Sequence, residues 1–130
     1  MIGLDTTFVI DLLKGRPEAM AKSKDIADET LVVTPVTVFE VFMGVYSRKD
    51  PREEEERQTI DFFDQVETIP LTPISARLGA KAAGTLARSG ESPQSTDAMI
   101  ASALAFHGCT SIVTRDKDFL KFKGLKVINY

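Results

Sequence analysis

The sequence predicts an α/β protein in which a parallel sheet is covered on both faces by helices. Short apolar runs, typical of buried strands, alternate along the chain with longer amphipathic stretches that are typical of helices. Strands separated by helices run parallel, and the crossing helices cover the sheet. The 130 residues fit one domain, residues 1–130, which is large enough to bury a core of its own.

Five apolar runs are predicted strands, because each is short and is bounded by polar residues, proline or glycine. They are Met1–Asp5, Leu31–Thr34, Thr68–Leu71, Cys109–Thr114 and Lys126–Asn129.

The stretches between these runs are predicted helices. In the first, Thr6 or Thr7 can act as N-cap, and the helix stops at Gly15. Asp50 and Pro51 mark a break between the third and fourth helices. Segments 92–96 and 115–119 are predicted loops. The remaining helices are Pro17–Ala27, Thr37–Ser47, Arg52–Val66, Pro73–Arg88 and Asp97–His107.

Composition narrows the class of function. The net charge of -3 argues against a protein whose whole surface is basic for nucleic acid, although it leaves a nuclease with an acidic site open. Cys109 is the single cysteine, so no intrachain disulfide can form, and the opening MIGLDTTFVI has no signal-peptide pattern. No apolar run approaches the ~20 residues that span a bilayer. We therefore expect a cytoplasmic protein with no membrane contact.

Four acids fall where such a fold places ligands, at the carboxyl ends of the strands. Asp5 ends the first strand, and Asp116 lies two residues beyond the strand that ends at Thr114. Asp97 opens a helix, and Glu40 lies in the first turn of the helix after the second strand. Four acids from distant segments are therefore expected to meet at one edge of the sheet.

Carboxylates held close together repel one another unless a proton or a cation neutralises them. Oxygen ligands favour a hard divalent ion, Mg²⁺ or Mn²⁺. Zinc is disfavoured, because its soft candidate ligands, His107 and Cys109, lie elsewhere in the pattern. Such an ion can hold a phosphodiester, orient a water and stabilise the charge that develops during displacement.

Each acid also has a purely structural interpretation. Asp5 can be a helix N-cap, although its threonine neighbours can serve equally well. Glu40 fits a capping box with Thr37, yet it is the only charge in an apolar stretch and needs a partner there. Asp97 can be a first-turn acid whose negative charge interacts favourably with the helix dipole, and Asp116 can be a turn residue. Together these interpretations require four coincidences at one edge.

The ordered set of MIGLDTTFVIDLL, TPVTVFEVFMGV, STDAMIASALAFHG and SIVTRDKDF resembles the PIN domain, and in particular the VapC-type toxins of toxin–antitoxin pairs. The resemblance covers essentially the whole chain. It implies a three-layer α/β/α fold with a parallel central sheet and Mg²⁺- or Mn²⁺-dependent cleavage of RNA. It also implies a homodimer and a small antitoxin partner that blocks the substrate groove.

Matched by position, the resemblance implies a role for each site residue. Asp5 corresponds to the first metal ligand, Glu40 to the glutamate after the second strand and Asp97 to the helix-opening aspartate. Asp116 corresponds to a variable fourth acid, for which Asp118 is a substitute or an addition. The small hydroxyl residues that line such sites are matched by Thr6 and Thr114.

Basic residues near these motifs are candidates for phosphate contacts, although each can equally be a solvated surface residue. They are Arg16, Arg48, Lys49, Arg115, Lys117, Lys121 and Lys123.

Three rival classes remain. A phosphatase with an aspartyl nucleophile fits Asp5, but Thr7 stands where its second acid is expected. A receiver domain lacks its acidic pair at the end of the first strand, and neither class explains Glu40. The third is a non-catalytic binding module with the same fold, which need not hold a metal. An RNA-processing nuclease outside any toxin–antitoxin pair is the alternative biological role.

Overall fold

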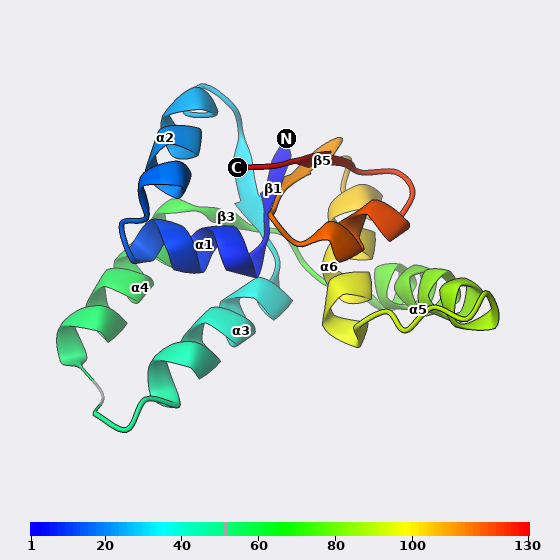
Figure 1. The fold of residues 1–130 in the computed structure, drawn as a ribbon, viewed down its shortest axis with the longest axis horizontal. Helices are drawn as coiled ribbons and strands as arrows, with labels where there is room; N and C mark the ends of the chain where they lie inside the picture. Colours follow the sequence, from blue (N-terminus) through cyan, green and yellow to red (C-terminus); the bar gives the residue numbers. More distant parts are fainter. Residues whose placement is uncertain (51) are drawn as a thin grey trace.

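A computed structural model describes residues 1–50 and 52–130 (Figure 1). The strands are β1 (Ile2–Leu4), β2 (Leu31–Val33), β3 (Glu67–Thr68), β4 (Ser111–Val113) and β5 (Lys126–Ile128). The helices are α1 (Thr6–Leu13), α2 (Pro17–Asp25), α3 (Pro35–Tyr46), α4 (Glu53–Gln65), α5 (Pro73–Arg88) and α6 (Ser95–Phe106). A short 3₁₀ helix, η1 (Lys117–Lys121), follows β4.

The five strands form one parallel sheet in the order β3-β2-β1-β4-β5. The central strand β1 pairs with β2 on one side, where Ile2 lies opposite Leu31, and with β4 on the other, where Ile2 lies opposite Ser111. The chain builds outward from β1 to β3 and later returns to add β4 and β5. The strand order therefore reverses between β1 and β4, which is where open parallel sheets bind ligands.

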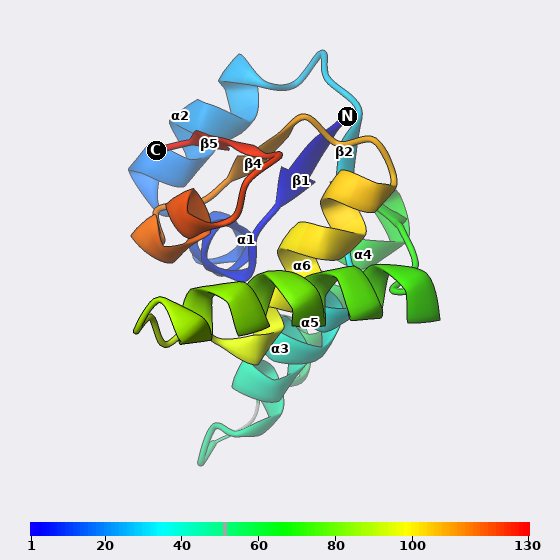
Figure 2. The ribbon, with the colours of Figure 1, turned by 90° about the vertical axis from the view of Figure 1, so that its right-hand side faces the viewer.

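Helices cover both faces of the sheet, so the predicted three-layer α/β/α fold is confirmed. Helices α1 to α4 lie on one side of β1 and helices α5 and α6 on the other, with α5 outside α6 (Figures 1 and 2). Each face buries its own apolar cluster. One includes Leu4, Phe8 and Val41, and the other includes Ile100 and Leu104. Burial on both faces explains why the three inner strands, β1, β2 and β4, are short and largely apolar.

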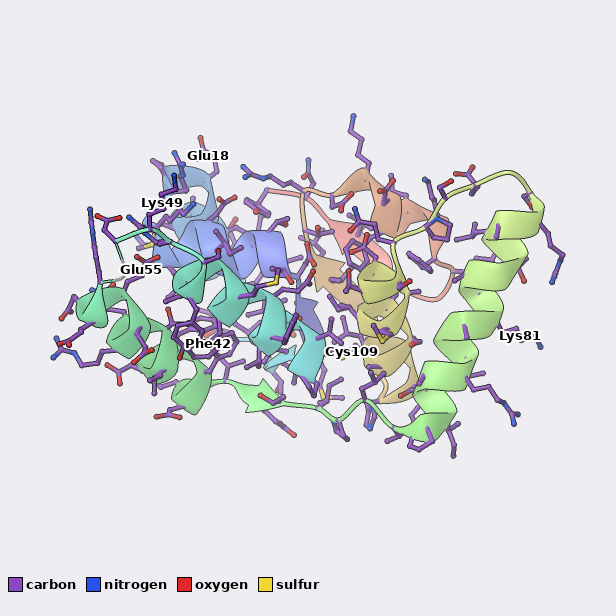
Figure 3. All side chains as sticks on the ribbon, turned by 90° about the horizontal axis from the view of Figure 1, so that it is seen from below. Glu18, Phe42, Lys49, Glu55, Lys81 and Cys109 are labelled. Carbon is purple, nitrogen blue, oxygen red and sulfur yellow. The ribbon has the colours of Figure 1, made fainter. Side chains whose placement is uncertain are left out.

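Helix α3 and helix α4 pack against each other through aromatic side chains. Phe42 lies between the two helices (Figure 3), with its ring 5.6 Å from that of Phe63. On the opposite face, α5 approaches α6 closely at Gly79. A Cβ added there would lie 2.7 Å from Ser102 Oγ and 3.0 Å from the carbonyl oxygen of Ala98.

Two predicted helix caps are wrong. Strand β1 ends at Leu4, and Asp5 itself is the N-cap of α1, in place of Thr6 or Thr7. Helix α3 starts two residues earlier than predicted, with Thr34 as N-cap. The physical reason is that the Thr34 hydroxyl accepts from the Thr37 backbone N–H, and a proline follows at the first helical position. The capping box between Thr37 and Glu40, which was the structural alternative for Glu40, therefore does not form.

Other boundaries shift by a few residues. Helix α5 has the predicted bounds, whereas β3 begins one residue before the predicted strand and ends at Thr68. The segment predicted as a loop after β4 contains η1. The predicted break at Asp50 and Pro51 includes Pro51, which lies outside the described residues. Within the described residues, none of the helices is both long and apolar enough to cross a membrane.

Candidate metal centre

The predicted acids lie around the carboxyl ends of β1 and β4, the two strands between which the order reverses. Asp5 follows β1, and Asp116 follows β4 after Thr114 and one further residue. Asp97 lies in the first turn of α6. Glu40 is the sixth residue of α3, in its second turn rather than in the predicted first. The first turns of α1, α3 and α6 lie near one another in Figures 1 and 2.

Three carboxylates form a tight group. Asp97, Asp116 and Asp118 each offer an oxygen, and these oxygens all lie within 4.8 Å of one another. Asp116 is the N-cap of η1, and its Oδ1 accepts from the Asp118 backbone N–H at 2.9 Å. The sequence left open whether Asp116 or Asp118 is the fourth acid, and the fold brings both to Asp97.

Asp5 is held at the centre of a hydrogen-bond network. It is buried, and its Oδ2 accepts from the hydroxyls of Thr7 and Thr114, each at 2.8 Å. The Thr114 hydroxyl oxygen in turn accepts from the Asp116 backbone N–H at 2.9 Å. Burial raises the pKa of Asp5, and the two threonine hydroxyls oppose that shift by bonding to the ionised form. The network therefore fixes Asp5 and ties it to the segment that carries Asp116.

Glu40 has a partner other than the expected capping group. Its Oε1 accepts from the Thr6 hydroxyl at 2.7 Å. The side chain is half-buried, so the cost of a fully buried charge does not arise here. Both threonines expected to line the site, Thr6 and Thr114, thus contact acids of the cluster.

The pKa of Asp97 is raised by its burial and by the acids around it. Burial raises its pKa to about 7, and the negative charges of the four neighbouring acids add to the shift. These are, from the largest effect to the smallest, Asp116, Asp5, Glu40 and Asp118. Among the described residues, Asp97 Oδ2 is the one buried side-chain polar atom without a hydrogen-bond partner. A buried, unpaired carboxylate oxygen of this kind is costly unless a cation or proton binds it.

These residues fit a hard divalent cation. The grouped donors are carboxylate oxygens of Asp97 on α6 and of Asp116 and Asp118 after β4, and Asp97 also has an oxygen, Oδ2, without a hydrogen-bond partner. The two candidate zinc ligands lie away from the acidic group. His107 is the C-cap of α6, at the opposite end of that helix from Asp97, and Cys109 is buried two residues further along the chain. Mg²⁺ or Mn²⁺ therefore suits the site better than zinc.

Two basic residues near the site are already paired with acids. Lys121 Nζ lies 3.0 Å from Glu91 Oε2 and 3.1 Å from Asp118 Oδ1. Arg115 pairs with Asp11, which is outside the cluster, with Nη2 3.0 Å from Oδ2. The sequence reasoning missed Asp11, although it is the one charge in the otherwise apolar helix α1, and such a charge signals a partner.

The fold and the acidic edge define an α/β protein with a cluster of carboxylates, of a kind suited to a divalent cation, at the switch point of its sheet. The family model of the PIN domain matches residues 2–125, so the chain belongs to the PIN-domain family. No curated protein matches it.

Solved structures resemble the chain over its whole length. A chain of the Rickettsia felis VapBC2 structure, bound to a DNA fragment from the promoter, has a TM-score of 0.86 at 20% identity, covering 100% of this chain and 99% of that one. A chain of the DNA-bound VapBC structure from Salmonella typhimurium has a TM-score of 0.85 at 22% identity, covering 98% and 96%. A chain of a toxin–antitoxin complex from Klebsiella pneumoniae has a TM-score of 0.73 at 21% identity, covering 97% and 96%. At these identities the likeness supports the fold.

Proposed function

We propose that this chain, as a single nuclease domain, is an endoribonuclease that uses Mg²⁺ or Mn²⁺ to hydrolyse phosphodiester bonds. The observation that carries the proposal is the group of Asp97, Asp116 and Asp118, with Asp5 and Glu40 beside it, at the switch point of a PIN fold. Members of this family are nucleases that use divalent metals. A phosphodiester brings more negative charge to a site that is already acidic, so a cation is needed to neutralise both.

In this proposal Asp97, Asp116 and Asp5 hold the cation, and Asp118 adds a further oxygen. When bound, the cation supplies positive charge to a phosphoryl oxygen and lowers the pKa of a bound water. The hydroxyls of Thr7 and Thr114 set the position of the Asp5 carboxylate before binding, and Asp97 presents a buried oxygen that has no other partner. Little reorganisation is then required when charge develops at phosphorus.

Glu40 is proposed to orient the attacking water. The Thr6 hydroxyl occupies Oε1, which fixes the carboxylate and leaves Oε2 to accept from water. The water oxygen attacks phosphorus, the bond from phosphorus to the leaving oxygen breaks, and the leaving oxygen takes a proton from solvent water. In this scheme Glu40 accepts the proton that the water loses.

We further propose that the chain is the toxin of a toxin–antitoxin pair, acts as a homodimer and is blocked by a small antitoxin. The support is the likeness to chains from VapBC and toxin–antitoxin structures. A groove of about 540 Å³ between α1, α3 and α4, lined in part by Ile10, Leu13, Val41 and Val45, offers apolar surface to an antitoxin segment. Suppression of RNA cleavage by the product of an adjacent small reading frame would support the pairing. Cleavage that no such product affects would favour an RNA-processing role.

The test of the nuclease proposal is RNA cleavage by the purified chain with Mg²⁺, with Mn²⁺ and with EDTA, beside Asp5→Asn and Asp97→Asn. Asp61→Asn on the exposed surface of α4 is the matched control. We expect cleavage by the wild type and the control only, and only with a metal. Equal cleavage in every sample would refute the proposal. A chain that neither cleaves RNA nor binds Mn²⁺ would instead be a binding module.

A further inference from the structure

The one acidic residue within α1, which lies outside the candidate metal centre, joins three distant parts of the chain. Asp11 is buried, and both of its carboxylate oxygens are engaged. Its Oδ2 lies 3.0 Å from Arg115 Nη2 and accepts from the Tyr130 hydroxyl at 2.8 Å, while Oδ1 accepts from Arg115 Nη2 at 3.3 Å. Arg115 follows β4 and Tyr130 follows β5, so Asp11 connects one helix to the ends of two neighbouring strands.

The aromatic contacts of Tyr130 stabilise this arrangement. Its ring packs edge-on against Phe8, with centroids 5.0 Å apart, and the Arg115 guanidinium lies 5.9 Å from the ring centre. Burial, aided by the nearby Asp11 carboxylate, raises the pKa of Tyr130 to about 12. The hydroxyl therefore stays protonated and donates to Asp11 throughout the neutral range.

The connection lies directly beside the proposed metal ligands. Helix α1 holds the segment after β4 at two consecutive residues: Thr114 donates to Asp5, and Arg115 pairs with Asp11. The next residue, Asp116, points instead to Asp97 on α6. Together with the backbone hydrogen bonds from Asp5 N to Val113 O and from Thr114 N to Ile128 O, these two side-chain attachments fix both the position and the direction of this backbone.

We propose that Asp11, Arg115 and Tyr130 act as positioning residues that hold the β4–η1 segment so that Asp116 and Asp118 meet Asp97 around the cation. This inference rests on the proposed function, because it assigns the three residues to that metal site. A Mg²⁺-like ion demands near-ideal octahedral geometry, so small displacements of a ligand weaken binding. Groups that orient metal ligands typically change metal affinity by about 10- to 100-fold when they are lost.

The rival interpretation is that Arg115 binds a phosphate of the substrate. Its side chain is 59% exposed, and Nη2 makes both contacts with Asp11. The geometry favours the positioning role, because the same residue is anchored to a buried carboxylate and directly precedes a proposed ligand. The two roles differ in what they change: a positioning residue changes metal affinity, whereas a phosphate contact changes the KM for RNA.

The experiment measures Mn²⁺ binding by the full chain, by calorimetry and by the EPR signal of free Mn²⁺, alongside the Mn²⁺ concentration for half-maximal RNA cleavage. The variants are Asp11→Asn, Arg115→Gln and the double variant D11N/R115Q. Tyr130→Phe is the mildest change, since it removes one hydroxyl. Exposed residues provide matched controls: Asp61→Asn, Arg77→Gln and Tyr46→Phe. Circular dichroism establishes that each variant is folded.

We expect the single variants to weaken Mn²⁺ binding about 10-fold, with the KM for RNA unchanged at saturating Mn²⁺. D11N/R115Q replaces the ion pair by an uncharged amide pair, so its loss should be smaller than the combined losses of the two single variants. Controls should bind as the wild type does.

Two results would overturn the inference alone: wild-type Mn²⁺ affinity in folded Asp11→Asn and Tyr130→Phe, or a raised KM for RNA in Arg115→Gln with unchanged Mn²⁺ affinity. A wild-type chain that binds no Mn²⁺ would refute the proposed function as well.

Discussion

Replacement of Asp97 by asparagine should stabilise the metal-free protein at neutral and alkaline pH, although it removes a proposed metal ligand. The pKa of Asp97 is about 7 in the folded chain, against 3.8 for a free aspartate side chain. Because the folded state binds the proton more tightly, the wild type loses stability as pH rises from about 4 to about 7. Above that range the full cost of ionising Asp97 remains. Asparagine resembles the neutral form and avoids that cost.

The size of the effect follows from this difference in pKa. Each pH unit corresponds to about 1.4 kcal/mol, so a rise of about three units sets an upper bound of about 4 kcal/mol. Asp116 and Asp118 are only partly buried, and water screens their charges, so we expect about 1–3 kcal/mol at pH ~8. At pH ~4, where Asp97 is protonated in the folded state and half-protonated in the unfolded one, the two proteins should be nearly equal in stability.

The assay is urea unfolding in EDTA at several values of pH, with Asp61→Asn as control. Saturating Mn²⁺ should then stabilise the wild type by about 2.7 kcal/mol at 100 times its Kd, with little gain for Asp97→Asn. The reasoning would be refuted if Asp97→Asn gave no gain at pH ~8 in EDTA, or the same gain at every pH.

Further predictions concern the network and the packing around it. Thr114→Val keeps the side-chain shape but removes one of the two hydroxyls bound to Asp5 Oδ2 and leaves the Asp116 N–H without its partner, so urea unfolding should show a loss of about 1–3 kcal/mol. Gly79→Ala should lower the unfolding free energy by about 1–3 kcal/mol, since its Cβ meets α6. In the same assay Gly84→Ala, with nothing within 4 Å, should raise it by about 0.5–1 kcal/mol. Glu40→Gln keeps an acceptor for Thr6, so the melting temperature should stay unchanged while RNA cleavage falls at least 10-fold.

Local signals in the sequence were sufficient for most of the fold. The bounds of α5 could be predicted because Thr72 and Pro73 mark its start and Gly90 follows its end. The start of α3 was predicted wrongly, because two threonines one turn apart, Thr34 and Thr37, were both good caps. Proline at position 35 favours the earlier one, since proline is preferred at the first helical position.

Local sequence signals were not sufficient for the contacts within the site, because those contacts join residues that are far apart in the sequence. The positions of Asp5, Asp97 and Asp116 at the ends of elements follow from the pattern of apolar runs. The partners of Asp11 do not, because Arg115 and Tyr130 lie 104 and 119 residues away in the sequence. An isolated charge in an apolar helix indicates that some partner exists, but only the folded sheet determines which one.

The raised pKa of Asp97 was also beyond local reasoning, because it sums burial with the charges of four acids from three other segments. The fold brings these charges together at the point where the strand order reverses, and packing on both faces of the sheet opposes their separation. The resulting repulsion destabilises the metal-free chain, and in the proposed metal centre it would raise the affinity for a cation, since a cation relieves that repulsion as it binds. The stability gained by Asp97→Asn in EDTA and the metal affinity that it loses therefore have one origin.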